Sequence, residues 1–122
     1  MSAEYRLDQP TGFACPECGG AAESQTTGTL LQYRCHIGHV LTAETMLAAQ
    51  FTVLETKLAA CLAALNERAE VCRQMIEQRR TQGVDTAPLE RARREMLGHA
   101  GTLKGLLEGE WAQTGREYGR RQ

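Results

Sequence analysis

Hydrophobic and polar residues follow a helical pattern through the middle of this chain. From residue 42 to residue 82, apolar or small residues recur every three or four positions, and no Pro or Gly interrupts them. This spacing is typical of a coiled-coil seam. The expected seam residues are Leu47, Phe51, Leu54, Leu58, Cys61, Leu65, Cys72 and Met75. Arg68 breaks this seam, and neighbouring Ala69 can cover the break. Leu62, Ala69 and Ile76 widen the apolar stripe. The pattern predicts one helix of about 40 residues.

Residues with strong end preferences mark where this helix begins and ends, and where a second one starts. Thr42 is a good N-cap, and Gly83 ends the uninterrupted stretch. Asp85 or Thr86 can cap the next helix, with Pro88 in its first turn. The second helix has its own apolar stripe, made of Leu89, Ala92, Met96, Ala100, Leu103, Leu107 and Trp111. Two helices joined by so short a loop predict an antiparallel hairpin over residues 42–114.

The second helix carries two further features. Gly98, Gly101, Gly105 and Gly109 fall in a row opposite the apolar stripe. This row is either neutral drift on an outer face or a shallow groove for another helix. His99 lies at the edge of the apolar stripe, where we expect a half-buried structural histidine.

The N-terminal part of the chain predicts short strands and turns. Residues 21–26 and 30–34 can form two strands, and Thr27-Gly28 is a turn signal between them. Residues 1–11 suggest an arm or a first short strand. We therefore expect residues 1–41 to form an arm and a small ribbon, the ribbon itself spanning about 7–41. Residues 115–122 are expected to be a flexible tail.

Two short motifs in this ribbon carry metal-ligand chemistry. Cys15-Pro16-Glu17-Cys18-Gly19 forms one, and Cys35-His36-Ile37-Gly38-His39 forms the other. Tetrahedral zinc takes four Cys or His ligands, commonly presented as two such pairs. Cys15, Cys18, Cys35 and His39 are the expected ligands of one Zn²⁺. His36 competes with His39 for the fourth position, but the Cys35–His39 spacing leaves Gly38 free to make the turn.

Four protein ligands close a zinc site, whereas a catalytic zinc keeps an open position for water. The chain has neither the His-Glu-x-x-His arrangement of zinc proteases nor a His-x-Glu ahead of its cysteines. We therefore expect a structural zinc and no enzyme. Zinc-bound thiolates can also be oxidised, so a redox sensor is an alternative. Cys61 and Cys72 both fall on the predicted seam and are expected to be buried, with a thiol sensor or an interchain disulfide as the alternative.

Composition and charge narrow the classes of partner. The net charge of −1 argues against sequence-independent nucleic-acid binding, which needs a concentrated positive surface. We see no signal peptide and no apolar run close to the ~20 residues of a membrane span. Five cysteines, three of them in a metal pattern, fit a reducing cytoplasm better than a disulfide scaffold.

The segments Phe13–Gly20, Tyr33–His39 and Thr42–Gln50 together carry a family resemblance. They resemble the C-terminal extension of some bacterial chemotaxis-type protein-glutamate methylesterases, in which two such knuckles precede a long helical segment. The match covers about residues 12–80 and, more loosely, continues to about 107. The resemblance implies bacterial, cytoplasmic, signalling-associated zinc binding through Cys15, Cys18, Cys35 and His39. It does not imply methylesterase activity, which belongs to a separate α/β domain. We expect a stand-alone relative rather than a fragment.

These expectations combine into one hypothesis. The fold is α+β and mostly α, with a small zinc ribbon followed by a long, coiled-coil-like antiparallel two-helix hairpin. The function is a non-enzymatic protein–protein interaction module, an accessory or adaptor in bacterial, chemotaxis-like signalling. It acts with a protein partner and as a homodimer through the helices, without membrane or nucleic-acid contact. A transcription-associated zinc-ribbon regulator is a further alternative.

Overall fold

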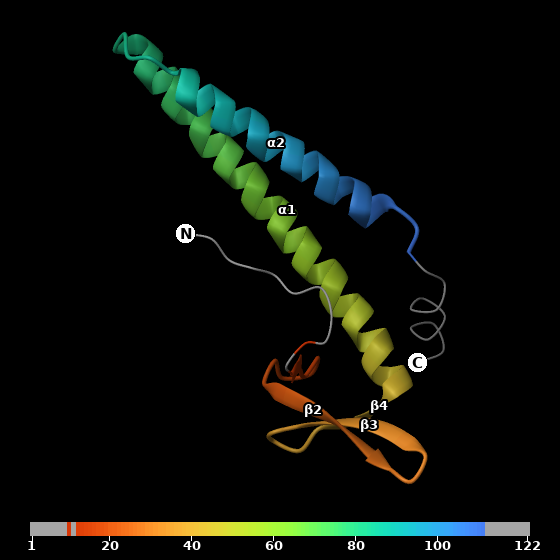
Figure 1. Ribbon diagram of the computed structural model, residues 1–122. Helices are drawn as coiled ribbons and strands as arrows, with labels where there is room; N and C mark the ends of the chain where they lie inside the picture. The colour runs from red at the N-terminus through yellow and green to blue at the C-terminus, as the bar shows by residue number, and fades with distance from the viewer. Residues whose placement is uncertain (1–9, 11, 112–122) are drawn as a thin grey trace. The chain divides into compact units, whose positions relative to one another are not determined.

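The computed structural model describes residue 10 and residues 12–111 and has an α+β, mostly α architecture. Four strands come first, β1 (Phe13–Ala14), β2 (Ala21–Thr27), β3 (Leu30–Cys35) and β4 (Val40–Thr42). Two helices follow, α1 (Ala43–Thr81) and α2 (Ala87–Glu108) (Figure 1). The predicted fold class is confirmed. The expected first strand or arm within residues 1–11 and the tail at 115–122 lie outside the described residues.

The chain divides into two compact units, and the division falls inside α1. The described part of the first unit ends at Val53, and the second unit runs from Leu54 to Trp111. The first therefore holds the sheet and the beginning of α1. The second holds the rest of α1 together with α2.

The sheet is a small antiparallel meander with the strand order β1-β2-β3-β4. Thr27 pairs with Leu30, which leaves Gly28 and Thr29 as a two-residue hairpin loop. Gly28 has a φ of 64°, the left-handed conformation that such a loop requires and that glycine adopts at little cost. The predicted strands and turn are confirmed to within a residue or two. Strand β4 was not predicted.

The core of the first unit is small and shared with the two cysteine loops. Its buried residues are Cys15, Ala22, Cys35, Leu41 and Met46, the last from the first turns of α1. Phe13 and Tyr33 pack against this cluster and meet edge to face, with ring centroids 5.2 Å apart. Two of the five core residues are thus candidate metal ligands, which ties the stability of this unit to the cysteine loops.

Helix α1 begins and ends at the residues that the sequence marks. The Thr42 hydroxyl oxygen accepts a hydrogen bond from the Thr45 N–H at 3.1 Å, as an N-cap does. At the other end Gly83 has a φ of 71°, and its N–H donates to the Arg80 carbonyl. The Val84 N–H donates to the Arg79 carbonyl, which completes a Schellman cap.

Helix α2 runs back antiparallel to the C-terminal part of α1 within the second unit (Figure 1). Thr86 is its N-cap residue by position, but the side chain of Asp85 accepts the Ala87 N–H. Every residue of the predicted stripe on α2 is at least partly buried, and Ala100 is buried. The Gly row is exposed, and a Cβ added at Gly98, Gly101 or Gly105 would meet no atom of the described residues within 4 Å.

The predicted seam of α1 is partly right, since Leu58, Leu65, Cys72 and Met75 are buried or partly buried. Cys61 and Leu54 are exposed, whereas Ala69, Cys72 and Ile76 are buried. The observed seam in the second unit is Leu58, Leu62, Leu65, Ala69, Cys72 and Ile76. Arg68, which breaks the predicted seam, is exposed, and the neighbouring Ala69 is buried and covers the break as expected.

By length and composition alone, α1 could cross a membrane. It contains an 18-residue stretch with a mean hydropathy of 1.3, of which 11% is buried. The expectation that no apolar run approaches a membrane span is therefore wrong by this criterion. Core helices of water-soluble proteins and signal sequences pass the same test, so a single helix of this kind assigns no location.

Candidate metal centre

The first cysteine loop is folded by backbone hydrogen bonds between β1 and β2. The Cys15 N–H donates to the Gly20 carbonyl at 2.8 Å, and the Gly19 N–H donates to the Cys15 carbonyl at 2.7 Å. Gly19 has a φ of 77°, which few other residues tolerate. The turn leaves the Gly20 N–H 3.4 Å from the Cys18 sulfur, to which it donates. The loop thus presents both sulfurs while supplying a donor to one of them.

The second loop repeats this design between β3 and β4. The Cys35 N–H donates to the His39 carbonyl at 2.9 Å, and the Gly38 N–H donates to the Cys35 carbonyl at 3.1 Å. Gly38 has a φ of 106°, so the glycine expected to make this turn does so. The His39 N–H then donates to the Cys35 sulfur at 3.3 Å. A backbone donor on the sulfur favours the thiolate, which is the form that binds metal.

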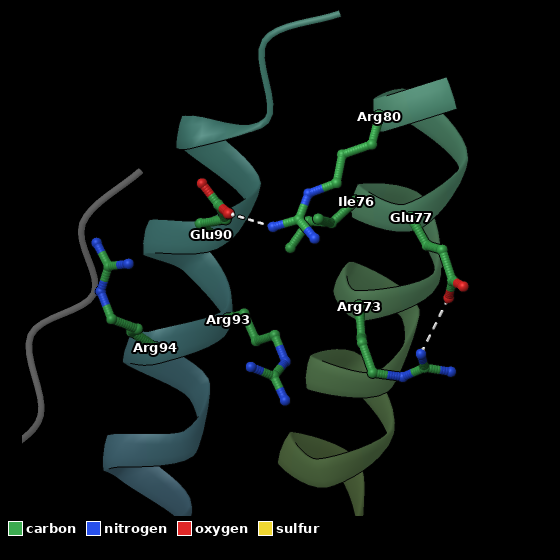
Figure 2. A pocket seen from close by; sticks show the side chains of 7 residues that line it. All are labelled: Arg73, Ile76, Glu77, Arg80, Glu90, Arg93 and Arg94. Atoms are coloured by element: carbon green, nitrogen blue, oxygen red, sulfur yellow. Dashed lines mark hydrogen bonds and ion pairs between the residues drawn. The ribbon is translucent and has the colours of Figure 1, made fainter. Parts of the chain in front are cut away.

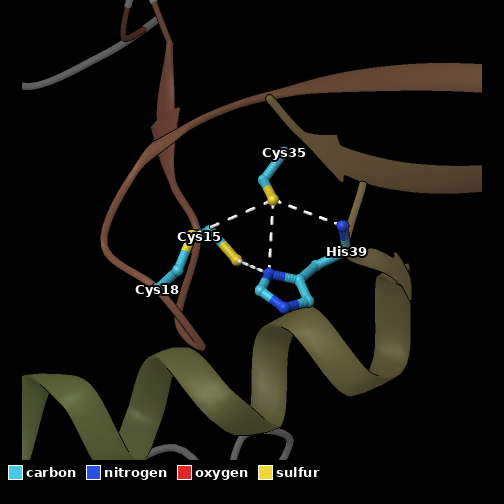
Figure 3. A group of neighbouring side chains, drawn as sticks. All are labelled: Cys15, Cys18, Cys35 and His39. Carbon is cyan, nitrogen blue, oxygen red and sulfur yellow. Dashed lines mark hydrogen bonds between the residues drawn. The ribbon is translucent and has the colours of Figure 1, made fainter. Parts of the chain in front are cut away.

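The four predicted ligands come together at one point. Cys15 Sγ, Cys18 Sγ, Cys35 Sγ and one ring nitrogen of His39 all lie within 4.8 Å of one another (Figure 3). Cys18 Sγ is 3.9 Å from Cys35 Sγ. His39 Nδ1 is 3.3 Å from Cys35 Sγ and 3.7 Å from Cys15 Sγ.

These three separations are close to the edges of a zinc tetrahedron. With Zn–S bonds of about 2.3 Å and a Zn–N bond of about 2.05 Å, tetrahedral geometry requires sulfurs about 3.8 Å apart. The same bonds require sulfur and nitrogen about 3.6 Å apart. The observed 3.9, 3.7 and 3.3 Å bracket these values. The four side chains are therefore positioned to bind a metal ion of this size.

The protonation of the cluster depends on its hydrogen bonds. Burial alone would raise the pKa of Cys35, but backbone N–H groups of Ile37 and His39 outweigh it and lower the pKa to about 6. Burial also opposes the shift at Cys15, where donors from the same loop lower the pKa of the thiol. The Gly20 N–H favours the Cys18 thiolate, yet burial and the neighbouring thiols raise the pKa of Cys18. Sulfurs this close resist ionising together, and a bound dication would remove that resistance.

His39 faces the cluster with one ring nitrogen and a carboxylate with the other. Contacts with Cys15 and then Cys35 raise the pKa of the imidazole despite its partial burial. Its Nε2 lies 3.4 Å from a carboxylate oxygen of Glu17, in the first cysteine loop. A carboxylate on the far nitrogen of a ligating histidine fixes the tautomer and ring orientation. Sequence analysis missed this role for Glu17, although a carboxylate between two ligand cysteines was the available signal.

His36 takes no part in the cluster. It is exposed, its backbone N–H donates to the Ala21 carbonyl, and its ring lies over Gly20. A Cβ at Gly20 would meet the His36 ring, so a larger residue there would require that ring to move. The preference for His39 over His36 agrees with this geometry.

The remaining candidate side chains lie outside the metal centre. Cys72 is buried as expected, but Cys61 is exposed, because Leu62 rather than Cys61 lies in the seam at that turn of α1. His99 is also exposed rather than half-buried. The apolar stripe on α2 runs through Met96, Ala100 and Leu103, and His99 falls just beyond its edge.

Three thiols and one imidazole form a soft, nitrogen- and sulfur-rich donor set. Tetrahedral sites of this composition are typical of zinc or of iron–sulfur chemistry, and a Cys₃His set with no further ligand position is common for structural zinc. Comparison of the chain with protein-family models, with curated proteins and with solved structures found no match.

Proposed function

We propose that Cys15, Cys18, Cys35 and His39 bind one Zn²⁺ that stabilises the first unit of the protein. The observation that carries this proposal is the convergence of four ligand atoms, from two separate loops, within 4.8 Å. The N–H donors on the Cys18 and Cys35 sulfurs and the Glu17 carboxylate near His39 support it. Bound zinc would hold the two loops together and neutralise the thiolates.

We further propose that the protein is not an enzyme. Four protein ligands would fill the coordination sphere and leave no position for a reactive water. Among the described residues, the cluster of potential metal ligands is this one group of four. The zinc in this proposal has a structural role, and binding to other proteins supplies the activity.

The helices are the proposed contact surface. In the second unit the hairpin buries one face of each helix, and large apolar side chains remain exposed on the others. These are Leu54 and Val71 on α1, and Leu97 and Leu106 on α2. Pairing of two hairpins into a four-helix bundle would cover such side chains, so we propose a homodimer.

The wider role that we propose is an adaptor in bacterial, chemotaxis-like signalling, acting in the cytoplasm on a protein partner. The support for this role is the resemblance of the two knuckles and the following helix to the methylesterase extension. A reducing compartment would keep the ligand thiols available for metal.

A zinc-thiolate redox sensor is the second candidate. Cys18 is exposed while Cys15 and Cys35 are buried, so one ligand sulfur is accessible to an oxidant. Peroxide treatment distinguishes the two roles. A structural zinc is retained under mild oxidation, whereas a sensor releases it rapidly and regains it after reduction.

Cobalt substitution tests the metal proposal, and sedimentation tests the assembly proposal. Co²⁺ in a Cys₃His site is expected to give intense visible absorption and thiolate charge-transfer bands. In the Cys35→Ser variant, the intensity of the thiolate charge-transfer bands should fall in part. In the Cys61→Ser variant, which changes an exposed cysteine outside the cluster, the intensity should stay the same. Sedimentation equilibrium of the zinc-loaded chain should show a dimer. A monomer at all accessible concentrations would overturn the assembly proposal and leave the metal site standing.

A further inference from the structure

A cavity lined mainly by arginines lies between α1 and α2 in the second unit, near the hairpin loop. Its volume is about 590 Å³. Four arginines, two glutamates and one isoleucine line it: Arg73, Ile76, Glu77, Arg80, Glu90, Arg93 and Arg94 (Figure 2). The volume lies within the range of small-molecule sites. Neither the metal centre nor the proposed dimer accounts for so many guanidinium groups at one place.

Two of these arginines are matched by carboxylates. Arg73 makes a two-point contact with Glu70, at 2.8 Å for each hydrogen bond, and a further one with Glu77 at 3.1 Å. Arg80 reaches across from α1 and pairs with Glu90 on α2 at 3.0 Å (Figure 2). These pairs satisfy the two guanidinium groups that α1 contributes.

Arg93 is different. Its side chain extends from α2 into the space between the helices (Figure 2), and it makes no ion pair with a carboxylate of the described residues. Its Nε is buried and has no hydrogen-bond acceptor among those residues. A buried donor without an acceptor is unfavourable, more so on a charged group. Because Nε has almost no area open to solvent, the Arg93 atoms that can reach a ligand in the cavity are its two terminal nitrogens (Figure 2).

The charges of the lining indicate what kind of acceptor fits. Four arginines against two glutamates leave two positive charges, and counting Glu70, the partner of Arg73, still leaves one. Guanidinium groups donate in a planar fork that matches the oxygens of phosphate. The net positive charge of the lining is small, and glutamates flank the arginines. The cavity therefore favours a single phosphate group over a nucleic-acid backbone, which would need a continuous positive surface.

We propose that this cavity binds the phosphate group of a small phosphorylated metabolite, with Arg93 as the principal contact. Arg93 donates N–H groups of its two terminal nitrogens to phosphate oxygens. Arg80 and Arg73, held in place by their glutamate partners, supply the surrounding positive field. Ile76, which is buried, is the apolar residue of the cavity lining.

The test uses the full-length, zinc-loaded chain and titrates inorganic phosphate at constant ionic strength, followed by amide chemical shifts. We expect saturable shifts in residues 73–94 with a dissociation constant of about 1 mM or tighter. Glycerol phosphate in a second titration distinguishes the sources. If glycerol phosphate binds more tightly than inorganic phosphate, the ligand is a phosphorylated metabolite. If inorganic phosphate binds more tightly, the metabolite proposal is overturned and free phosphate is the ligand.

Three variants show whether Arg93 makes the contact. Arg93→Gln should weaken phosphate binding about tenfold or more, the loss expected for a charge-assisted hydrogen bond. Arg93→Lys keeps the charge but removes Nε and the fork, and it should weaken binding nearly as much. Arg91→Gln, which removes the same charge from an exposed position on α2 outside the lining, should change it less than about twofold.

Circular dichroism must first show that each variant keeps its helices. The proposal is overturned if wild-type shifts do not saturate, or if chloride produces the same shifts as phosphate. It is also overturned if a folded Arg93→Lys variant binds like the wild type, or if Arg91→Gln weakens binding as much as Arg93→Gln. None of these four outcomes bears on zinc binding, which is measured separately.

Discussion

Removing the metal is expected to unfold the first unit and spare the second. Of the five buried residues in the core of the first unit, Cys15 and Cys35 are candidate metal ligands, and Ala22 is small. The large apolar side chains are Leu41 and Met46, whose burial contributes about 3–6 kcal/mol together. Structural zinc contributes about 10–16 kcal/mol of apparent binding free energy in small domains. Zinc is therefore the larger contribution, and a sheet with so small a core should not persist without it.

Hydrogen exchange with residue-level resolution measures this directly. After chelation in the presence of reductant, amide protection across β2 and β3 should fall to the level of an unfolded chain. The amides of α1 and α2 between Leu54 and Trp111 should keep theirs, since their buried seam contains no ligand. Added zinc should restore the protection, and Cys61→Ser should behave like the wild type throughout.

The reasoning is refuted if the strand amides stay protected in protein whose metal content has been shown to be zero. It is equally refuted if Cys35→Ser keeps full protection in β2 and β3 without bound metal. Either result would mean that Leu41, Met46 and the backbone hydrogen bonds are sufficient, and that the four ligands serve another purpose.

Four further predictions follow from particular residues. Gly105→Ala should raise the free energy of unfolding by up to about 1 kcal/mol in thermal or urea unfolding, because the added Cβ meets open space and alanine favours helix. Gly83→Ala should lower it by about 1 kcal/mol, because alanine is strained at a φ of 71°; the opposite signs would contradict this account. In zinc-loaded native protein, iodoacetamide should label exposed Cys61 much faster than buried Cys72, as peptide mass spectrometry can show, and equal rates would refute the assigned register of α1. Glu17→Gln should weaken zinc binding about tenfold in competition with a chromogenic chelator, since it removes the carboxylate beside His39; an unchanged affinity would show that this contact does not orient the ring.

Features with short-range physical causes could be predicted from the sequence. Thr42 caps α1 and Gly83 ends it because both act through neighbouring backbone groups. The ligand set could be predicted because Gly19 and Gly38 fix how each loop presents its side chains. Strand β4 could not, because Val40-Leu41-Thr42 is too short to show an alternating pattern and forms a strand only by pairing with β3.

The register of the helix pair was ambiguous in the sequence for a different reason. Leu58, Leu65 and Cys72 belong to both possible seams, which differ in whether Cys61 or Leu62 accompanies them. The hydrophobic periodicity fits both seams equally well. Which of them is buried depends on which face of α1 contacts α2. That is a tertiary contact, so the exposures of Cys61 and His99 followed only from the structure.

Native mass spectrometry of the purified protein, with the metal identified and quantified, tests the central claim most directly. We predict one zinc ion per chain, lost together with the fold of the first unit when Cys35 is replaced by serine. Protein that contains no metal and yet keeps the β2–β3 hairpin folded would contradict the claim and leave Cys15, Cys18 and Cys35 as redox-active thiols.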